Sequence, residues 1–111
     1  MATEAPSPGQ PDKFQPLRDA YGAALPGRIA QVCDAWARVK DNGSETVDWR
    51  ELQRLVHTLA GSAGTFGFHA LGDQARELED FLSAPEDCAK DERAAAIERR
   101  LASLRSLADK P

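Results

Sequence analysis

The sequence has no long run of apolar residues, few aromatic residues and only two cysteines. No segment approaches the roughly 20 consecutive apolar residues that a membrane-spanning helix needs. Cys33 and Cys88 are far apart and form neither a zinc knuckle nor a disulfide framework, a pattern typical of a reducing compartment. The sequence therefore predicts a cytoplasmic protein without a membrane span or a metal site.

Basic residues are not in excess, because 14 Lys and Arg stand against 18 Asp and Glu, for a formal net charge of −4. Nucleic-acid binding requires concentrated positive charge, so nucleic acid is not an expected partner. A chain of 111 residues forms one ordinary domain. Because aromatic residues make up only 6% of it, Leu and Ala must build the core. The composition indicates a small soluble helical domain.

The chain divides into a tail and one domain. Residues 1–12 contain several prolines and no apolar run, which predicts a disordered tail that is not a signal peptide. Over residues 13–109, apolar residues recur at three- and four-residue steps in five stretches, the spacing of amphipathic helices. The first stretch is short, and the second begins near Pro26. Short connections favour antiparallel neighbours. We therefore predict an all-α, antiparallel up-and-down four-helix bundle with a short additional N-terminal helix.

The segment from His57 to Phe68 carries the most information about function. At about 100° per residue, His57 lies off the core stripe of its helix. It shares that face with Gln53, Arg54, Ala60, Gly61 and Gly64. Glycine inside a helix costs about 1 kcal/mol relative to Ala, so these glycines favour a face that a second protein approaches closely. They are equally compatible with a helix terminus near Gly61 or Gly64, and Gly67 is the stronger stop signal in either case.

The motif resembles that of the histidine-containing phosphotransfer (HPt) domain family. His57, Leu59, Gly61 and Ser62 match a His-x-Leu-Lys-Gly-Ser-like signature on the second helix of the family's four-helix bundle. The run over residues 64–68 is also similar to the phosphoryl-accepting domain of the chemotaxis histidine kinase. The resemblance implies a phosphoryl carrier in a two-component phosphorelay. In this interpretation, His57 accepts a phosphoryl group from a receiver-domain aspartyl phosphate, or from a kinase, and passes it to another receiver.

Glu79 is the candidate for orienting the nucleophile. Only an imidazole nitrogen without a proton can attack, so a partner must hold the proton of the other nitrogen. A carboxylate at Glu79, on the facing helix, would accept from Nδ1 of His57 and leave Nε2 free. The resemblance implies an acidic or amide residue at this place. Without the resemblance, a solvated helix residue is the favoured interpretation of Glu79.

The chain departs from the family pattern at one position. The lysine usually found one turn after the histidine is Ala60 here, although a phosphoryl group brings nearly two negative charges. Arg54, three residues before His57 on the same face, and Arg76, one turn before Glu79, are the candidates for neutralising it. Each is also compatible with an ordinary surface arginine. We expect the partner-binding surface to comprise Gln53, Ala60, Gly61, Gly64 and Arg76.

The sequence lacks the Gly-Lys-Ser/Thr of a P-loop and any zinc-ligand spacing. We therefore predict a monomeric phosphotransfer intermediate without an ATP site, kinase activity or cofactor of its own. Its partners are expected to be receiver domains or a sensor histidine kinase, with Mg²⁺ supplied by the receiver. Two alternatives stay open. One is the substrate domain of a histidine kinase, and the other, favoured by Ala60, is a non-catalytic adaptor that binds receivers.

Overall fold

A computed structural model of the chain describes residues 13–42, 47–84 and 90–109, and every regular element within these ranges is a helix. The helices are α1 (Gln15–Asn42), α2 (Val47–Thr65), α3 (His69–Ser83) and α4 (Lys90–Asp109). The prediction of an all-α fold is confirmed. The predicted tail over residues 1–12 lies outside the described residues.

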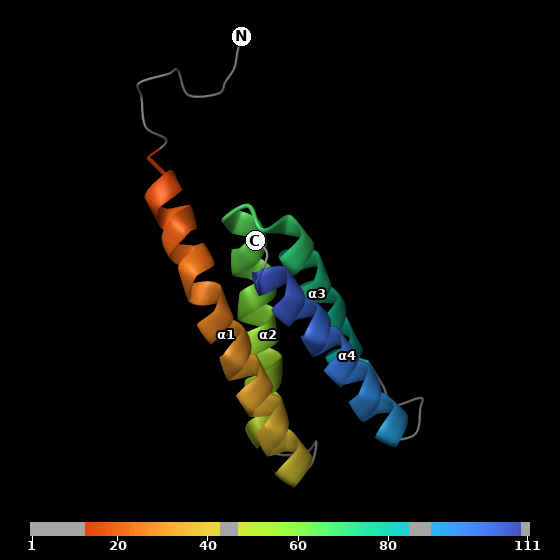
Figure 1. Ribbon diagram of the computed structural model, residues 1–111. Helices are drawn as coiled ribbons and strands as arrows, with labels where there is room; N and C mark the ends of the chain where they lie inside the picture. The colour runs from red at the N-terminus through yellow and green to blue at the C-terminus, as the bar shows by residue number, and fades with distance from the viewer. Residues whose placement is uncertain (1–12, 43–46, 85–89, 110–111) are drawn as a thin grey trace.

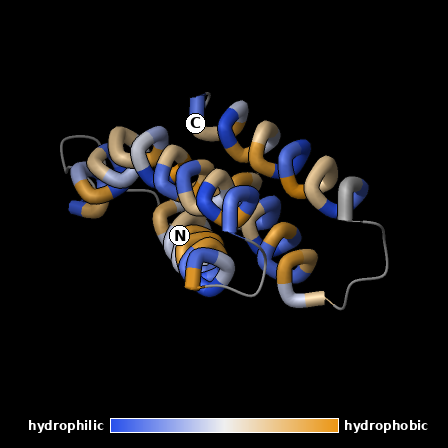
Figure 2. Tube along the Cα trace, turned by 90° about the horizontal axis from the view of Figure 1, so that it is seen from below, coloured by the Kyte–Doolittle hydropathy of each residue, from blue (hydrophilic) through white to orange (hydrophobic). Residues whose placement is uncertain are grey.

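The four helices lie along one another, and in Figure 1 each helix returns in the direction opposite to the one before it. Contacts join α1 to α2, α2 to α3, α3 to α4, and α1 to α4. Hydrophobic residues face the neighbouring helices in the view along the bundle in Figure 2. The core consists mostly of Leu and Ala, as the low aromatic content predicts, with Tyr21 and Trp36 as its buried aromatic residues among those described.

The predicted short N-terminal helix is wrong, because it is continuous with the next helix as α1. Pro26 lies inside α1. An internal proline costs about 3 kcal/mol, since it removes a backbone donor and crowds the preceding turn. The apolar stripe nevertheless continues across it, and Tyr21, Leu25 and Ile29 are all buried. Burial of one such side chain contributes about 1.5–3 kcal/mol, so the three together outweigh the proline penalty.

The first turns of α1 extend beyond the other helices (Figure 1). Phe14, just before α1, and Leu17 continue the apolar stripe toward the N-terminus, but they are 55% and 53% exposed. Tyr21 is the first residue of the stripe to reach the core, and its ring stacks on Phe66 at a centroid distance of 4.8 Å. Burial along α1 therefore begins where the helix meets the turn between α2 and α3.

The turn between α2 and α3 shows which glycine ends α2. α2 continues through Gly61 and Gly64, so neither is a helix terminus. Gly67 has φ +92°, a left-handed conformation that glycine adopts readily. Its amide donates to the Gly64 carbonyl at 3.1 Å, and the Phe68 amide donates to the Ala63 carbonyl at 2.8 Å. This is the Schellman arrangement of a helix end, and the prediction that Gly67 stops the helix is confirmed.

Glu98 ties α4 to α1 through two hydrogen bonds. The indole Nε1 of the buried Trp36 and the ammonium of Lys40 both donate to its Oε2 at 3.0 Å. The hydrogen bond from Trp36, followed by that from Lys40, lowers the pKa of Glu98. A carboxyl group whose pKa is lowered by folding stabilises the protein above its unfolded pKa, and this contribution is lost as the pH falls through the folded pKa.

We expect Glu98→Gln to lower the melting temperature at neutral pH. The gap between wild type and variant is expected to shrink as the pH falls below about 4, because the wild-type carboxyl group then takes up a proton. Thermal unfolding followed by circular dichroism across this pH range measures the gap. An equal gap at every pH would show that the charge of Glu98 contributes nothing to stability.

Candidate functional site

His57 lies near the middle of α2 with its side chain 74% exposed, as the helical spacing predicts. Its Nδ1 lies 2.5 Å from Oε2 of Glu79 on α3, whose side chain is 27% exposed. The structure therefore brings together the two residues that the sequence analysis paired. An ionised carboxylate only accepts hydrogen bonds, so in the neutral imidazole Nδ1 must carry the proton. Nε2 is then the nitrogen with the free lone pair.

A close approach of α2 and α3 positions this pair. A Cβ atom added to Gly72 would lie 3.2 Å from the backbone nitrogen of Gly64 and 3.5 Å from the carbonyl oxygen of Ala60. Glycine at 72 therefore allows the two backbones to meet. Glu79 lies as many residues after Gly72 as His57 lies before Gly64. Because α2 and α3 run in opposite directions, Glu79 and His57 therefore lie at the same height along the bundle. The sequence analysis did not single out Gly72; the available signal was a glycine in a helix on the face that also carries Glu79.

Ala60 is 3% exposed, so its assignment to the partner-binding surface is wrong. It lies on the side of α2 that α3 covers, where its carbonyl approaches Gly72. Less of the α2 surface is exposed than the spacing of its apolar residues predicts, because α3 packs close against the helix. The other expected surface residues have accessible atoms: Gly61 and Arg76 are exposed, and Gln53 and Gly64 are half-buried.

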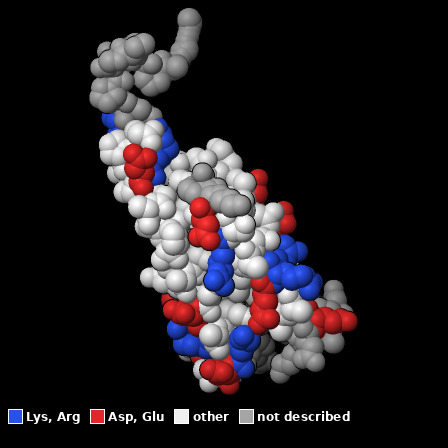
Figure 3. Space-filling view, in the orientation of Figure 1, with Lys and Arg blue, Asp and Glu red and all other residues white. Residues whose placement is uncertain are grey.

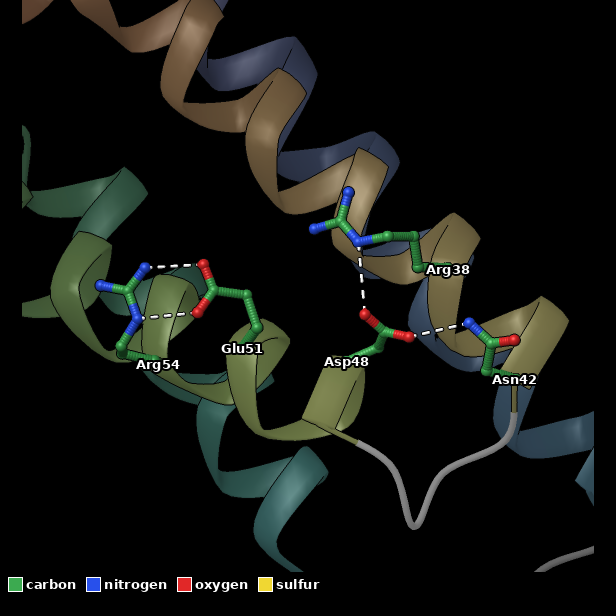
Figure 4. Close-up of polar contacts among 5 residues, drawn as sticks. All are labelled: Arg38, Asn42, Asp48, Glu51 and Arg54. Atoms are coloured by element: carbon green, nitrogen blue, oxygen red, sulfur yellow. Dashed lines mark hydrogen bonds and ion pairs between the residues drawn. The ribbon is translucent and has the colours of Figure 1, made fainter.

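Neither candidate arginine is hydrogen-bonded to His57 within the part of the chain that the structure describes. The guanidinium of Arg54 donates to both carboxylate oxygens of Glu51, from Nε at 2.9 Å and from a terminal nitrogen at 2.7 Å (Figure 4). A terminal nitrogen of Arg76 lies 3.9 Å from Asp73. Glu51 was not among the predicted site residues, although its three-residue spacing from Arg54 was the available signal.

Asp48 anchors the start of α2 to the end of α1. Its carboxylate accepts a hydrogen bond from the Asn42 side chain at 2.8 Å and lies 3.4 Å from Nε of Arg38 (Figure 4). The two contacts join residues on either side of residues 43–46, which lie outside the described part of the chain. Asp48 thus fixes the N-terminal end of α2, the helix that carries His57.

The signature residue Ser62 has a structural role that the sequence did not reveal. Its Oγ lies 2.6 Å from the Tyr21 hydroxyl and donates to the Thr58 carbonyl at 2.8 Å. Because the serine proton points to Thr58, Tyr21 is the donor in the other hydrogen bond. Tyr21 therefore connects α1 to α2 one turn after His57.

On one face of the molecule, the charges do not separate by sign (Figure 3). On the face shown in Figure 3, basic and acidic side chains are interspersed. No group of three or more His, Cys, Asp or Glu among the described residues could hold a metal ion. Cys33 is half-buried with a free thiol, and Cys88 lies outside the described residues. None of the described helices is long and apolar enough to cross a membrane.

The family model of the Hpt domain matches residues 16–109, most of the chain. The chain therefore belongs to the Hpt domain family, and the resemblance noted in its sequence is confirmed. Among curated proteins and among solved structures, none matches the chain. Hpt domains are phosphocarriers of two-component signalling that interact with receiver domains or kinases.

Proposed function

We propose that this chain carries a phosphoryl group on Nε2 of His57, taken from the aspartyl phosphate of one receiver domain and passed to another. The observation that carries the proposal is the exposed imidazole whose Nδ1 is bonded to Glu79. This contact favours the tautomer with a nucleophilic Nε2 on the solvent side. Family membership supports phosphotransfer as the chemistry.

The proposed transfer needs no reactant besides the histidine and the aspartyl phosphate. The Nε2 lone pair forms the N–P bond while the O–P bond of the acyl phosphate breaks, and the receiver aspartate leaves as a carboxylate. The imidazole becomes a cation that keeps its Nδ1 proton, and the carboxylate of Glu79 stabilises that charge. Transfer to the next receiver reverses these steps. The receiver supplies Mg²⁺, and the carrier acts as a monomer without an ATP site.

The docking surface that we propose surrounds His57 on α2. Gly61 is exposed, and an added Cβ atom there or at Gly64 would meet no atom within 4 Å. Bare backbone at these positions lets a receiver bring its aspartate within bonding distance of Nε2. Gln53 on α2 and Arg76 on α3 offer polar contacts at the edges of the same surface.

A second candidate function follows from Ala60. Because the usual lysine is absent, the chain could bind receivers as an adaptor without transferring a phosphoryl group. Incubation with phosphorylated receiver domains separates the two functions. We expect an acid-labile, base-stable phosphoryl adduct to appear on the chain. Receiver binding without any adduct would support the adaptor, and labelling only by a histidine kinase with ATP would identify a kinase substrate domain.

We expect Glu79→Ala to slow transfer from a phosphorylated receiver by about five- to twentyfold. A charge-assisted hydrogen bond contributes about 1.5–3 kcal/mol, and the exposure of His57 reduces this contribution. Single-turnover rates measured as a function of pH test the role, because a residue that fixes the tautomer changes the pH profile. Glu79→Gln keeps an acceptor without the charge and is expected to recover part of the rate. Identical profiles for all three proteins would contradict an orienting role for Glu79.

A further inference from the structure

We propose that Glu51 is a positioning residue that holds Arg54 away from His57 and thereby limits how strongly the phosphorylated histidine is stabilised. The proposal rests on the proposed transfer to His57. It assigns a role in that transfer to a residue that does not touch the reacting atoms.

The pair between Glu51 and Arg54 is well formed. Both carboxylate oxygens accept hydrogen bonds from the guanidinium, at 2.7 and 2.9 Å. The hydrogen bond from Arg54 lowers the pKa of Glu51, and the hydrogen bond to Glu51 raises the pKa of Arg54. Each residue therefore favours the charged form of the other.

The pair points away from the reacting nitrogen. Glu51, Arg54 and His57 follow one another at three-residue steps, so Glu51 and His57 lie about 9 Å apart along the helix axis. Helical side chains lean toward the N-terminus, which directs Arg54 to Glu51. Arg54 and Glu51 line a groove beside α1 together with Arg38, whereas His57 is bonded to α3. Nε and one terminal nitrogen of the guanidinium are both engaged by Glu51 in this geometry.

Phosphorylation of His57 creates a competing acceptor. The phosphoryl group carries nearly two negative charges, against one on the carboxylate of Glu51. The family lysine is replaced by the buried Ala60, so Arg54 is the basic residue of α2 nearest in sequence to His57. To turn these two nitrogens toward the phosphoryl group, Arg54 must give up its hydrogen bonds to Glu51. Glu51 therefore opposes the phosphorylated state by retaining the cation.

The test is the equilibrium constant for transfer between one phosphorylated receiver and this chain. Glu51→Gln removes the competing charge, and we expect it to shift the equilibrium toward phosphorylated His57 by about three- to tenfold. Arg54→Gln is expected to shift it the other way. In the Arg54→Gln background, Glu51→Gln is expected to change the equilibrium less than about twofold, because no cation is left to release.

Two further variants separate this role from a general effect of charge. Glu51→Asp keeps the carboxylate and is expected to remain closer to wild type than Glu51→Gln. Glu77→Gln removes one negative charge from an exposed ion pair with Arg100, which is not part of the proposed docking surface, and is expected to change the equilibrium less than about twofold. The NMR signal of the Arg54 Nε–H group reports directly on its partner, and we expect phosphorylation to move it further in Glu51→Gln than in wild type.

The possible failures are distinguishable. If wild type accepts no phosphoryl group from any receiver, the proposed function fails, and this proposal fails with it. If wild type is phosphorylated but Glu51→Gln has the same effect with and without Arg54, Glu51 acts only through its own charge and the proposal is overturned. An Arg54 signal that responds to phosphorylation no more in Glu51→Gln than in wild type would overturn it as well.

Discussion

Replacement of His57 by Gln is expected to abolish phosphoryl transfer to the chain. The glutamine amide has no basic lone pair on nitrogen, so no N–P bond can form at this position. The His57 side chain is 74% exposed, and its polar contact is with Glu79, so its loss leaves the core untouched. Helical circular dichroism is therefore expected to match wild type. The measurement is the acid-labile, base-stable adduct formed with phosphorylated receivers.

His69 provides the matched control for this experiment. It is the first residue of α3 and is exposed, so it presents a second accessible imidazole. We expect His69→Gln to be labelled like wild type. Labelling that persists in His57→Gln and disappears in His69→Gln would move the phosphoryl acceptor to His69 and contradict the proposed function.

Gly61→Gln is expected to reduce receiver-dependent phosphorylation by about 100-fold. The new side chain would start one turn after His57, in open space where the receiver must dock. Displacement of reacting atoms by about 1 Å can slow a reaction by about 100-fold. Glutamine is a better helix former than glycine, so the free energy of unfolding is expected to rise by up to about 1 kcal/mol. Single-turnover transfer rates and chemical denaturation measure the two effects.

Gly27→Gln is the control for Gly61→Gln. Gly27 is an exposed glycine inside α1, and an added Cβ atom there also meets nothing within 4 Å. The same substitution is expected to stabilise α1 without slowing transfer. Equal transfer rates for Gly61→Gln and wild type would place the docking surface away from Gly61.

The pair of His57 and Glu79 was predictable because it depends on two regular patterns. Helical periodicity placed His57 off the core stripe, and the turn signal at Gly67 predicted that the next helix faces the first. The family signature then implied a partner for the imidazole. The charge partner of Arg54 was harder to predict, since Glu51 and His57 each lie three residues from it along α2, and the structure shows it bound to Glu51.

The sequence by itself determined what depends on neighbours along the chain: the helices, the stop at Gly67 and the outward direction of His57. Only the tertiary structure decided how far each helix face is covered. Ala60 is buried because Gly72 lets α3 approach closely, and Phe14 is exposed because α1 extends beyond its partners. α1 also continues through Pro26, because burial against the neighbouring helices outweighs a local penalty. Contacts between distant segments decide these outcomes, and residue spacing within one helix carries no information about them.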